Sequence, residues 1–228
     1  MGRLFYNTIW TLGYPAFWTS ANPVILHRER ANLAGGYILA ANHTSPYDVP
    51  CLMATHPRVM DFVSITEVMN KPFVGWLFRN TGTFALDRSR RDSQAVRVIL
   101  DRLARGHVVT MFPEGRIPTR EQSVLYGGAI RRGIGRIAQM ANVPIVPCVI
   151  LGTVAYRRFT SWLSLRRTVY AVNFSEPISP TNASDDPDGE QLEVKLVESF
   201  HALFSELIEE VAKRELSDRL SMDFWKQD

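Results

Sequence analysis

Cysteine is scarce in this sequence, and metal-ligand patterns are missing. Only two cysteines, Cys51 and Cys148, occur among 228 residues, and each lies inside an apolar segment. This placement is typical of buried free thiols rather than of a disulfide framework, so we expect a reducing compartment. The five histidines show no spacing typical of a zinc site. We therefore expect no metal and no tightly bound cofactor.

The sequence also lacks an excess of one charge and two common enzyme motifs. Lysine and arginine number 26 against 23 acidic residues, a formal net charge of +3, which gives no reason to expect a nucleic-acid partner. No Gly-x-Ser-x-Gly motif occurs, which argues against a serine hydrolase. The pattern Gly133-x-Gly135-x-x-Ala138 matches a dinucleotide fingerprint, but no strand immediately precedes it, so nucleotide binding is not expected.

The first thirty residues are rich in aromatic side chains but are not uniformly apolar. Polar residues and prolines interrupt Leu4 to Leu26, so no run approaches the ~20 apolar residues that a membrane-spanning helix needs. The segment also lacks the features of a secretory signal. Because aromatic rings such as Trp10, Phe17 and Trp18 favour the headgroup layer, residues 1–30 are interpreted as a helical segment at a membrane interface. The alternative is an aromatic helix packed on the domain's own core.

Apolar runs alternate with amphipathic segments along the rest of the chain. Short buried strands are predicted over 36–41, 59–65, 83–86, 108–112, 145–151 and 169–174. Helices are predicted after Ser45 and over 93–104, 127–141 and, as a last long helix, 191–216. This alternation predicts an α/β fold with a mixed, largely parallel sheet flanked by helices. We expect a single domain, 1–228, whose α/β body spans 35–178.

The segment 42–48, Asn-His-Thr-Ser-Pro-Tyr-Asp, joins the first of these strands to its helix. Ser45 suits the N-cap, Pro46 the first helical position and Asp48 the third, so Asp48 is expected to accept a hydrogen bond from the Ser45 N–H. On one continuous helix, a five-residue spacing would place His43 and Asp48 about 140° apart, so His43 must precede the helix. From a loop it can fold back onto the carboxylate, which leaves its second ring nitrogen as a general base. The structural alternative is that Asp48 only caps the helix.

Three further blocks follow the His43 and Asp48 segment in order. They are Gly82-Thr83-Phe84-Ala85-Leu86-Asp87-Arg88, Phe112-Pro113-Glu114-Gly115-Arg116 and Val143-Pro144-Ile145-Val146-Pro147. With His-x-x-x-x-Asp, these blocks resemble the glycerolipid acyltransferase family, which includes lysophosphatidic acid acyltransferases. The resemblance covers roughly residues 35 to 152, and the first and third blocks carry most of its specificity.

The resemblance implies the fold of that family and O-acyl transfer to a lysophospholipid hydroxyl. Acyl-CoA or acyl carrier protein would be the co-substrate, and 1-acyl-glycerol-3-phosphate is the first acceptor to expect. His43 would remove the hydroxyl proton and Asp48 would orient the imidazole, while backbone N–H groups near Ser45 are candidates for the oxyanion hole. The alternatives are the same chemistry on glycerol 3-phosphate, a lyso-aminolipid or a glycolipid, and a non-catalytic lipid-binding protein on this scaffold.

The second and third blocks are expected to bind the acceptor. By resemblance, its phosphate would lie against Arg88 and the third block, because a guanidinium matches phosphate oxygens in a bidentate manner. The acceptor-binding residues would be Arg88, Glu114, Gly115 and Arg116. Since a carboxylate repels phosphate, Glu114 would instead hold Arg116 or Arg88, or accept a hydrogen bond from a glycerol hydroxyl. For Arg88, pairing with a surface aspartate is the alternative.

The third block departs from the family pattern, because its arginine stands one place early and Pro118 follows. This departure leaves the acceptor headgroup less well defined than the reaction. Where the family carries a lysine before the next helix, this chain has Arg131 and Arg132, which either contact an anion or lie on a solvated helix face. The fourth block has no titratable group, so its Pro144, Val146 and Pro147 would shape the acyl channel or the sheet.

A second segment suited to a membrane surface spans 156–167, where arginines alternate with aromatic and aliphatic residues. Its expected membrane contacts are Arg157, Arg158, Phe159, Trp162, Arg166 and Arg167. The alternative is a basic surface loop whose aromatic rings pack inward. We expect a peripheral or monotopic protein on the cytoplasmic face of a membrane. Its partners would be the membrane surface, the lysolipid acceptor and, as a candidate, acyl carrier protein.

Overall fold

Seven strands form one twisted sheet in the computed structural model, which describes residues 17–65, 84–86, 93–162, 167–182 and 184–225. Their order is β1-β7-β6-β2-β5-β3-β4. The strands are β1 Ala21–Leu26, β2 Tyr37–Ala41, β3 Met60–Ile65, β4 Phe84–Leu86, β5 Val108–Met111, β6 Ile145–Leu151 and β7 Thr168–Phe174. Neighbours pair in parallel except β6 and β7, which are antiparallel. The predicted mixed, largely parallel α/β sheet is confirmed.

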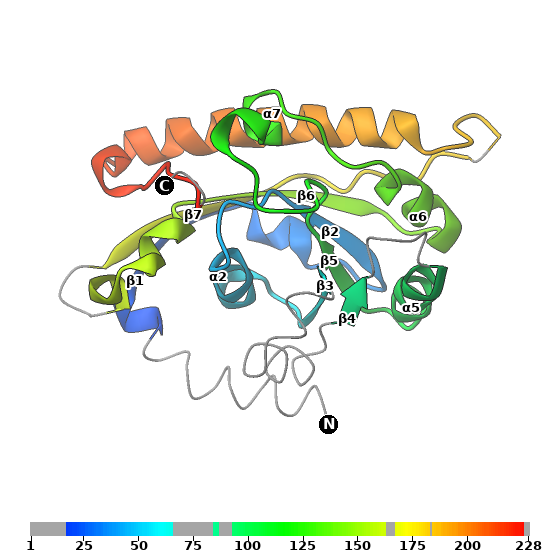
Figure 1. Cartoon of the computed structure of the whole chain (residues 1–228), viewed down its shortest axis with the longest axis horizontal. Coiled ribbons are helices and arrows are strands. Elements are labelled where there is room, and N and C mark those ends of the chain that lie inside the picture. Colours follow the sequence, from blue (N-terminus) through cyan, green and yellow to red (C-terminus); the bar gives the residue numbers. More distant parts are fainter. Residues whose placement is uncertain (1–16, 66–83, 87–92, 163–166, 183, 226–228) are drawn as a thin grey trace.

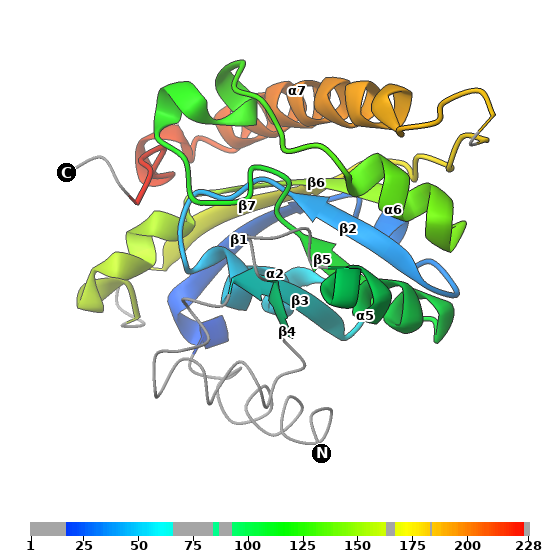
Figure 2. The same ribbon diagram turned by 45° about the vertical axis from the view of Figure 1, so that its right-hand side comes forward.

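Helices cover both faces of this sheet (Figures 1 and 2). The long helix α7 lies along one face and α2 lies against the other. The α-helices are α2 Asp48–Thr55, α5 Ser93–Ala104, α6 Ile134–Ala141 and α7 Glu190–Lys213. Short 3-10 turns connect several elements: η1 Arg28–Ala31, η2 Arg120–Gln122, η3 Val124–Tyr126, η4 Thr153–Arg157, η5 Phe159–Trp162 and η6 Ser217–Arg219.

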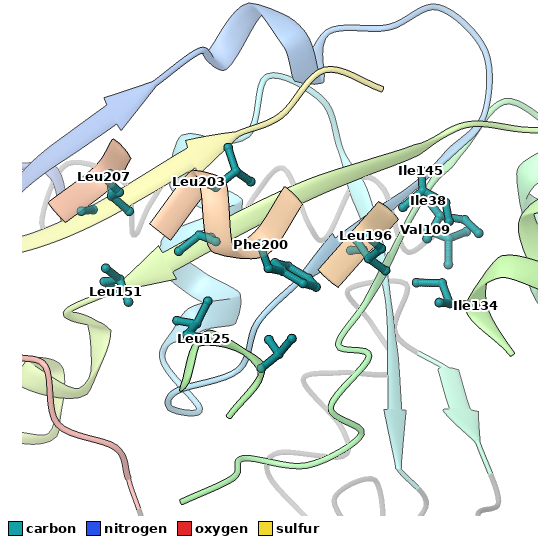
Figure 3. Close-up of a cluster of buried hydrophobic side chains, with 14 of the residues drawn as sticks. Ile38, Val109, Leu125, Ile134, Ile145, Leu151, Leu196, Phe200, Leu203 and Leu207 are labelled. Carbon is teal, nitrogen blue, oxygen red and sulfur yellow. The ribbon is translucent and has the colours of Figure 1, made fainter. Parts of the chain in front are cut away.

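The larger hydrophobic cluster lies between α7 and the sheet, as Figure 3 shows. Helix α7 buries Leu196, Phe200, Leu203 and Leu207, and their spacing of three and four residues places them on one face of the helix. They pack with β-strand residues and with side chains of α5 and α6. Each such side chain stabilises the fold by roughly 1.5–3 kcal/mol when fully buried. The helix is therefore held mainly by its apolar stripe.

A second cluster fills the opposite face, where α2 packs. Cys51 of α2 and Cys148 of β6 are both buried free thiols in this cluster, so the prediction of buried unpaired cysteines is confirmed. Val146 is fully buried in the same cluster. Pro147 is also buried, while Pro144 is partly exposed and accepts a hydrogen bond from the Ile38 N–H. The fourth sequence block thus lies in and beside a central strand.

Of the N-terminal segment predicted to be helical, the structure describes residues 17–30, and only residues 17–20 continue as an α-helix into the next element. Residues 21–26 are not part of an interfacial helix but form strand β1, which pairs in parallel with β7. Pro23 fits this position because β1 is an edge strand, where a missing N–H is tolerated. Phe17 is also buried, and its ring stacks on Tyr156 at 5.3 Å. Trp10 lies outside the described residues.

The helix predicted over 127–141 is shorter than expected. It begins at Ile134, and the residues before it include Gly127 and Gly133 with φ of 89° and 116°. Positive φ values interrupt a right-handed helix and are adopted readily by glycine. The segment carrying Arg131 and Arg132 is therefore a loop rather than a helix face.

Candidate active site

The carboxyl ends of three neighbouring strands form the candidate site. Strand β2 lies between β5 and β6 and is parallel to both, so the loops after these strands leave the sheet at the same edge. His43 follows β2, Glu114 follows β5 and Thr153 follows β6. The topology thereby brings His43 beside Glu114, 71 residues later, and Asp48 beside Thr153, 105 residues later.

His43 and Asp48 form the predicted pair. The Nδ1 of His43 donates to Oδ2 of Asp48 at 2.8 Å, with Asp48 fully buried and 16% of the His43 side chain exposed. The same carboxylate oxygen accepts from the backbone N–H groups of Thr44 at 2.7 Å and Ser45 at 2.9 Å. The expected contact between Ser45 and Asp48 is present. The N-cap of α2, however, is Tyr47 rather than Ser45. The Ser45 hydroxyl accepts a hydrogen bond from the Tyr47 N–H at 3.1 Å.

The other oxygen of Asp48 is held by two hydroxyl groups. Thr44 donates to Oδ1 at 3.1 Å, and the fully buried Thr153 donates a short hydrogen bond to the same atom. The Thr153 hydroxyl also lies 2.8 Å from that of Ser45. A buried carboxylate without partners would be strongly destabilising, and these contacts compensate for its loss of hydration. Thr153 was not among the residues that the sequence pointed to.

The imidazole of His43 has a defined orientation. Because Nδ1 donates to a carboxylate, the neutral ring carries its free lone pair on Nε2. The ring of Phe112 stacks against it, with centroids 4.1 Å apart and planes 18° apart. Among the residues that the structure describes, none forms a hydrogen bond with Nε2. The arrangement can therefore accept a proton from a hydroxyl placed at Nε2.

Glu114 positions the His43 backbone. Its Oε2 accepts from the His43 N–H at 2.6 Å, and its Oε1 accepts from the Ser123 hydroxyl at 2.8 Å and the Val124 N–H at 2.9 Å. Burial raises the pKa of the Glu114 carboxyl, while these hydrogen bonds act in the opposite direction. The expected pairing with Arg116 is absent from the described contacts, because Arg116 donates to Gln122 instead.

Arg131 lies beside the third block. A Cβ at Gly115, whose φ is 71°, would collide with the Nε and Cδ atoms of the Arg131 side chain. The backbone N–H of Arg131 donates to Pro113 at 2.8 Å. Arg132 instead forms an ion pair with Glu190. Of the two arginines before α6, only Arg131 therefore lies beside Gly115. Arg88 lies outside the described residues.

Aromatic and basic side chains gather around η4 and η5. Trp18, Phe159 and Trp162 are 57%, 78% and 40% exposed. The guanidinium of Arg167 lies 5.8 Å from the Trp18 ring, while Arg157 and Arg158 are exposed on the turns. Arg166 lies outside the described residues. Phe17 does not share this exposure, so its assignment as a membrane contact is wrong.

The described residues contain neither a helix that could span a membrane nor a cluster of potential metal ligands. No helix among them has the length and apolar character required to cross a membrane. Within the same part of the chain, no three side chains of histidine, cysteine, aspartate or glutamate gather as a metal site would require.

Comparisons with known proteins match this chain to acyltransferases. The Acyltransferase family model matches residues 24–151. The 1-acyl-sn-glycerol-3-phosphate acyltransferase of Saccharomyces cerevisiae is 30% identical over 163 residues, which cover 68% of this chain and 51% of that protein. The lyso-ornithine lipid O-acyltransferase of Rhodobacter capsulatus is 34% identical over 113 residues, which cover 47% of this chain and 40% of that protein. The chain thus spans about half the length of these relatives.

A solved structure shares the fold. The 1-acyl-sn-glycerophosphate (LPA) acyltransferase PlsC of Thermotoga maritima superposes with a TM-score of 0.65 at 23% identity, covering 88% of this chain and 78% of that one. The family match extends from β1 to the end of β6 and includes His43, Asp48 and Glu114. The chain belongs to the acyltransferase family, among the glycerolipid acyltransferases that its four sequence blocks resemble.

Proposed function

We propose that this protein transfers a fatty acyl group from a thioester donor to the free hydroxyl of a lysophospholipid. The observation that carries this proposal is the His43 ring, held by Asp48 at Nδ1 and by Phe112 on its face, in a chain of the acyltransferase family. The donor is acyl-CoA or acyl carrier protein. The first acceptor is 1-acyl-glycerol-3-phosphate, the compound specified in the names of several relatives.

The reaction proceeds by direct attack of the acceptor. The Nε2 of His43 takes the proton from the hydroxyl while its oxygen forms a bond to the thioester carbonyl carbon. Asp48 stabilises the resulting imidazolium. The tetrahedral intermediate then expels the thiolate, which receives the proton from the imidazolium, so no covalent acyl-enzyme is needed. General-base assistance of this kind contributes roughly 10²- to 10⁴-fold in rate.

Backbone N–H groups at the helix start already have partners inside the protein. The backbone N–H groups of Thr44 and Ser45 already donate to Asp48, and that of His43 donates to Glu114. The Tyr47 N–H is likewise bound to the Ser45 hydroxyl. Because each of these donors already has an intramolecular acceptor, we do not assign the oxyanion hole to them.

Arg131 and Arg116 are the basic residues suited to the acceptor headgroup. Both are exposed beside Gly115, and neither pairs with a carboxylate among the described residues. A guanidinium at this position matches a phosphate. A lyso-aminolipid is the second candidate acceptor, because one relative is named a lyso-ornithine lipid O-acyltransferase.

The membrane supplies the acceptor. We infer that the exposed rings of Trp18, Phe159 and Trp162 enter the acyl boundary on the cytoplasmic face. Arg158 and Arg167 would then meet anionic headgroups, each arginine contributing roughly 1 kcal/mol near such a surface. The protein would be peripheral or monotopic.

Mass spectrometry of products from a mixed pool tests the proposal. Purified protein is incubated with acyl-CoA and acyl carrier protein donors and with phosphate-bearing and amino-bearing lysolipids in vesicles. We expect a diacyl product from at least one pair. Vesicle binding without any acylated product would contradict the proposal and favour a non-catalytic lipid-binding protein.

The acceptor headgroup is tested by Arg131→Ala, with Arg132→Ala as the matched control. Because Arg131 adjoins Gly115 while Arg132 pairs with Glu190, only the first substitution should raise KM for phosphate-bearing acceptors, by roughly tenfold for one charge-assisted hydrogen bond. An equal effect of the two substitutions would contradict this assignment.

A further inference from the structure

Residues 220–225, which we call the tail segment, return from η6 to the catalytic edge of the sheet. They follow α7, the last long element of the chain, yet they contact the loops after β2 and β6 and the turn η3 after β5. The loop after β2 supplies His43 and leads to Asp48, and the loop after β6 supplies Thr153. The turn η3 begins with the residue whose N–H is bound to Glu114.

Leu220 contacts the loop after β6. It forms a parallel β-bridge with Val169, and its Cδ1 would lie 2.6 Å from a Cβ placed on Gly152. Gly152 directly precedes Thr153, whose hydroxyl donates to Asp48. The side chain of Leu220 thus packs against the peptide that sets the position of Thr153.

Phe224 contacts the turn that holds Glu114. It is 3% exposed, and its ring centroid lies 6.1 Å from that of Tyr126 in an edge-to-face arrangement. Tyr126 ends η3, and the first residue of that turn, Val124, donates its N–H to Glu114. Phe224 therefore packs on the turn whose first residue is hydrogen-bonded to Glu114.

Trp225 reaches the catalytic loop itself. Its backbone N–H donates to the Thr44 carbonyl at 3.0 Å, and its ring lies 5.8 Å from that of Tyr47 at 69°. Both contacts fall between His43 and Asp48. Thr44 also gives its N–H and its hydroxyl to Asp48, so one residue links the tail segment to the catalytic carboxylate.

We propose that the tail segment is a positioning element of the active site and that Trp225 is its key positioning residue. It holds the Thr44 peptide and thereby the spacing between His43 and Asp48. This inference rests on the proposed acyl transfer for its catalytic consequence. If the tail segment only filled the core, its loss would lower stability without altering the loop of a protein that remains folded.

Three substitutions of Trp225 separate the ring from the hydrogen bond. Trp225→Phe keeps a ring and the N–H, Trp225→Ala keeps only the N–H, and Trp225→Pro keeps neither. Asp223→Ala is the matched control, because its carboxylate contacts Ser221 within the tail segment. We expect kcat to fall roughly 3- to 10-fold in Trp225→Pro, as the loss of one hydrogen bond implies, less in Trp225→Ala and little in Trp225→Phe. KM for the donor should stay within about twofold of the wild-type value, because a twofold change corresponds to less free energy than one hydrogen bond contributes.

Hydrogen exchange tests the positioning without any turnover. In Trp225→Pro, the amides of Thr44 and Ser45 should exchange at least about tenfold faster, while the amide of Ile38 in β2 keeps the protection seen in Asp223→Ala. Equal exchange at Thr44 in the two variants would overturn the proposal. Faster exchange of Ile38 as well would also overturn it, because the tail segment would then act on global stability alone. Failure of the acyl transfer assay in wild-type protein leaves this test intact.

Discussion

Replacing Thr153 with valine removes one hydrogen bond from the Asp48 carboxylate and keeps the shape of the side chain. Asp48 accepts three hydrogen bonds at Oδ2, from His43, Thr44 and Ser45. At Oδ1 it accepts two, from Thr44 and Thr153. In Thr153→Val, Oδ1 keeps only the longer contact with Thr44, at 3.1 Å. The Ser45 hydroxyl also loses its partner at 2.8 Å.

The size of the effect follows from these contacts. A hydrogen bond to a buried charged group contributes about 1.5–3 kcal/mol, and for a chain of this size each kcal/mol shifts Tm by about 2–4 °C. Thr153→Val should therefore lower Tm by roughly 3–12 °C. The effect on kcat should be smaller than that of removing His43, at roughly tenfold or less, since the three contacts at Oδ2 remain.

The assay combines thermal unfolding by circular dichroism with steady-state acyl transfer, and Thr153→Ser serves as the control. Serine keeps the hydroxyl and loses only the methyl group, so it should recover most of the wild-type kcat. Wild-type Tm and kcat in Thr153→Val would refute the idea that Thr153 holds Asp48.

Two predictions concern pH. Glu114→Gln should lower kcat, because the amide cannot accept from His43, Ser123 and Val124 at once. Burial raises the pKa of Glu114 above 4.5, so the free energy of unfolding of wild-type protein falls as pH rises through that pKa. The glutamine variant does not titrate at this position. The difference in unfolding free energy between the two proteins, measured in urea, should therefore shrink toward neutral pH. Burial also lowers the pKa of His56 from 6.5 to about 4. The contribution of His56 to the unfolding free energy should therefore fall by about 3 kcal/mol as pH is lowered from 6.5 to 4. His56→Gln should remove this contribution, and a pH dependence of unfolding equal to that of wild-type protein would contradict the assignment.

Local sequence patterns were sufficient for most of the sheet. Buried strands such as Tyr37–Ala41 and Ile145–Leu151 are short apolar runs with turn residues around them, a pattern that depends little on distant contacts. Strand β1 was missed because its sequence, with Asn22 and Pro23, carries no strand pattern of its own. Its pairing with β7, about 147 residues later, is a tertiary contact.

The same distinction applies to the site. The contact between Ser45 and Asp48 was predictable because a helix start is a local feature. Thr153 acts across 105 residues, and only its place after an apolar strand parallel to β2 could have indicated it. The burial of Glu114 against the His43 backbone likewise depends on β5 lying beside β2. Side chains joined only by sheet topology leave no local pattern in the sequence.

Transfer of a labelled acyl group by wild-type protein and by His43→Ala is the direct test of general-base catalysis by His43. The donor is acyl-CoA or acyl carrier protein, and the acceptor is a lysolipid in vesicles. We expect product with wild-type protein and a rate lower by roughly 10²- to 10⁴-fold in His43→Ala, the range for loss of a general base. Vesicle binding by both proteins controls for loss of membrane contact. Full activity in His43→Ala would contradict general-base catalysis by His43.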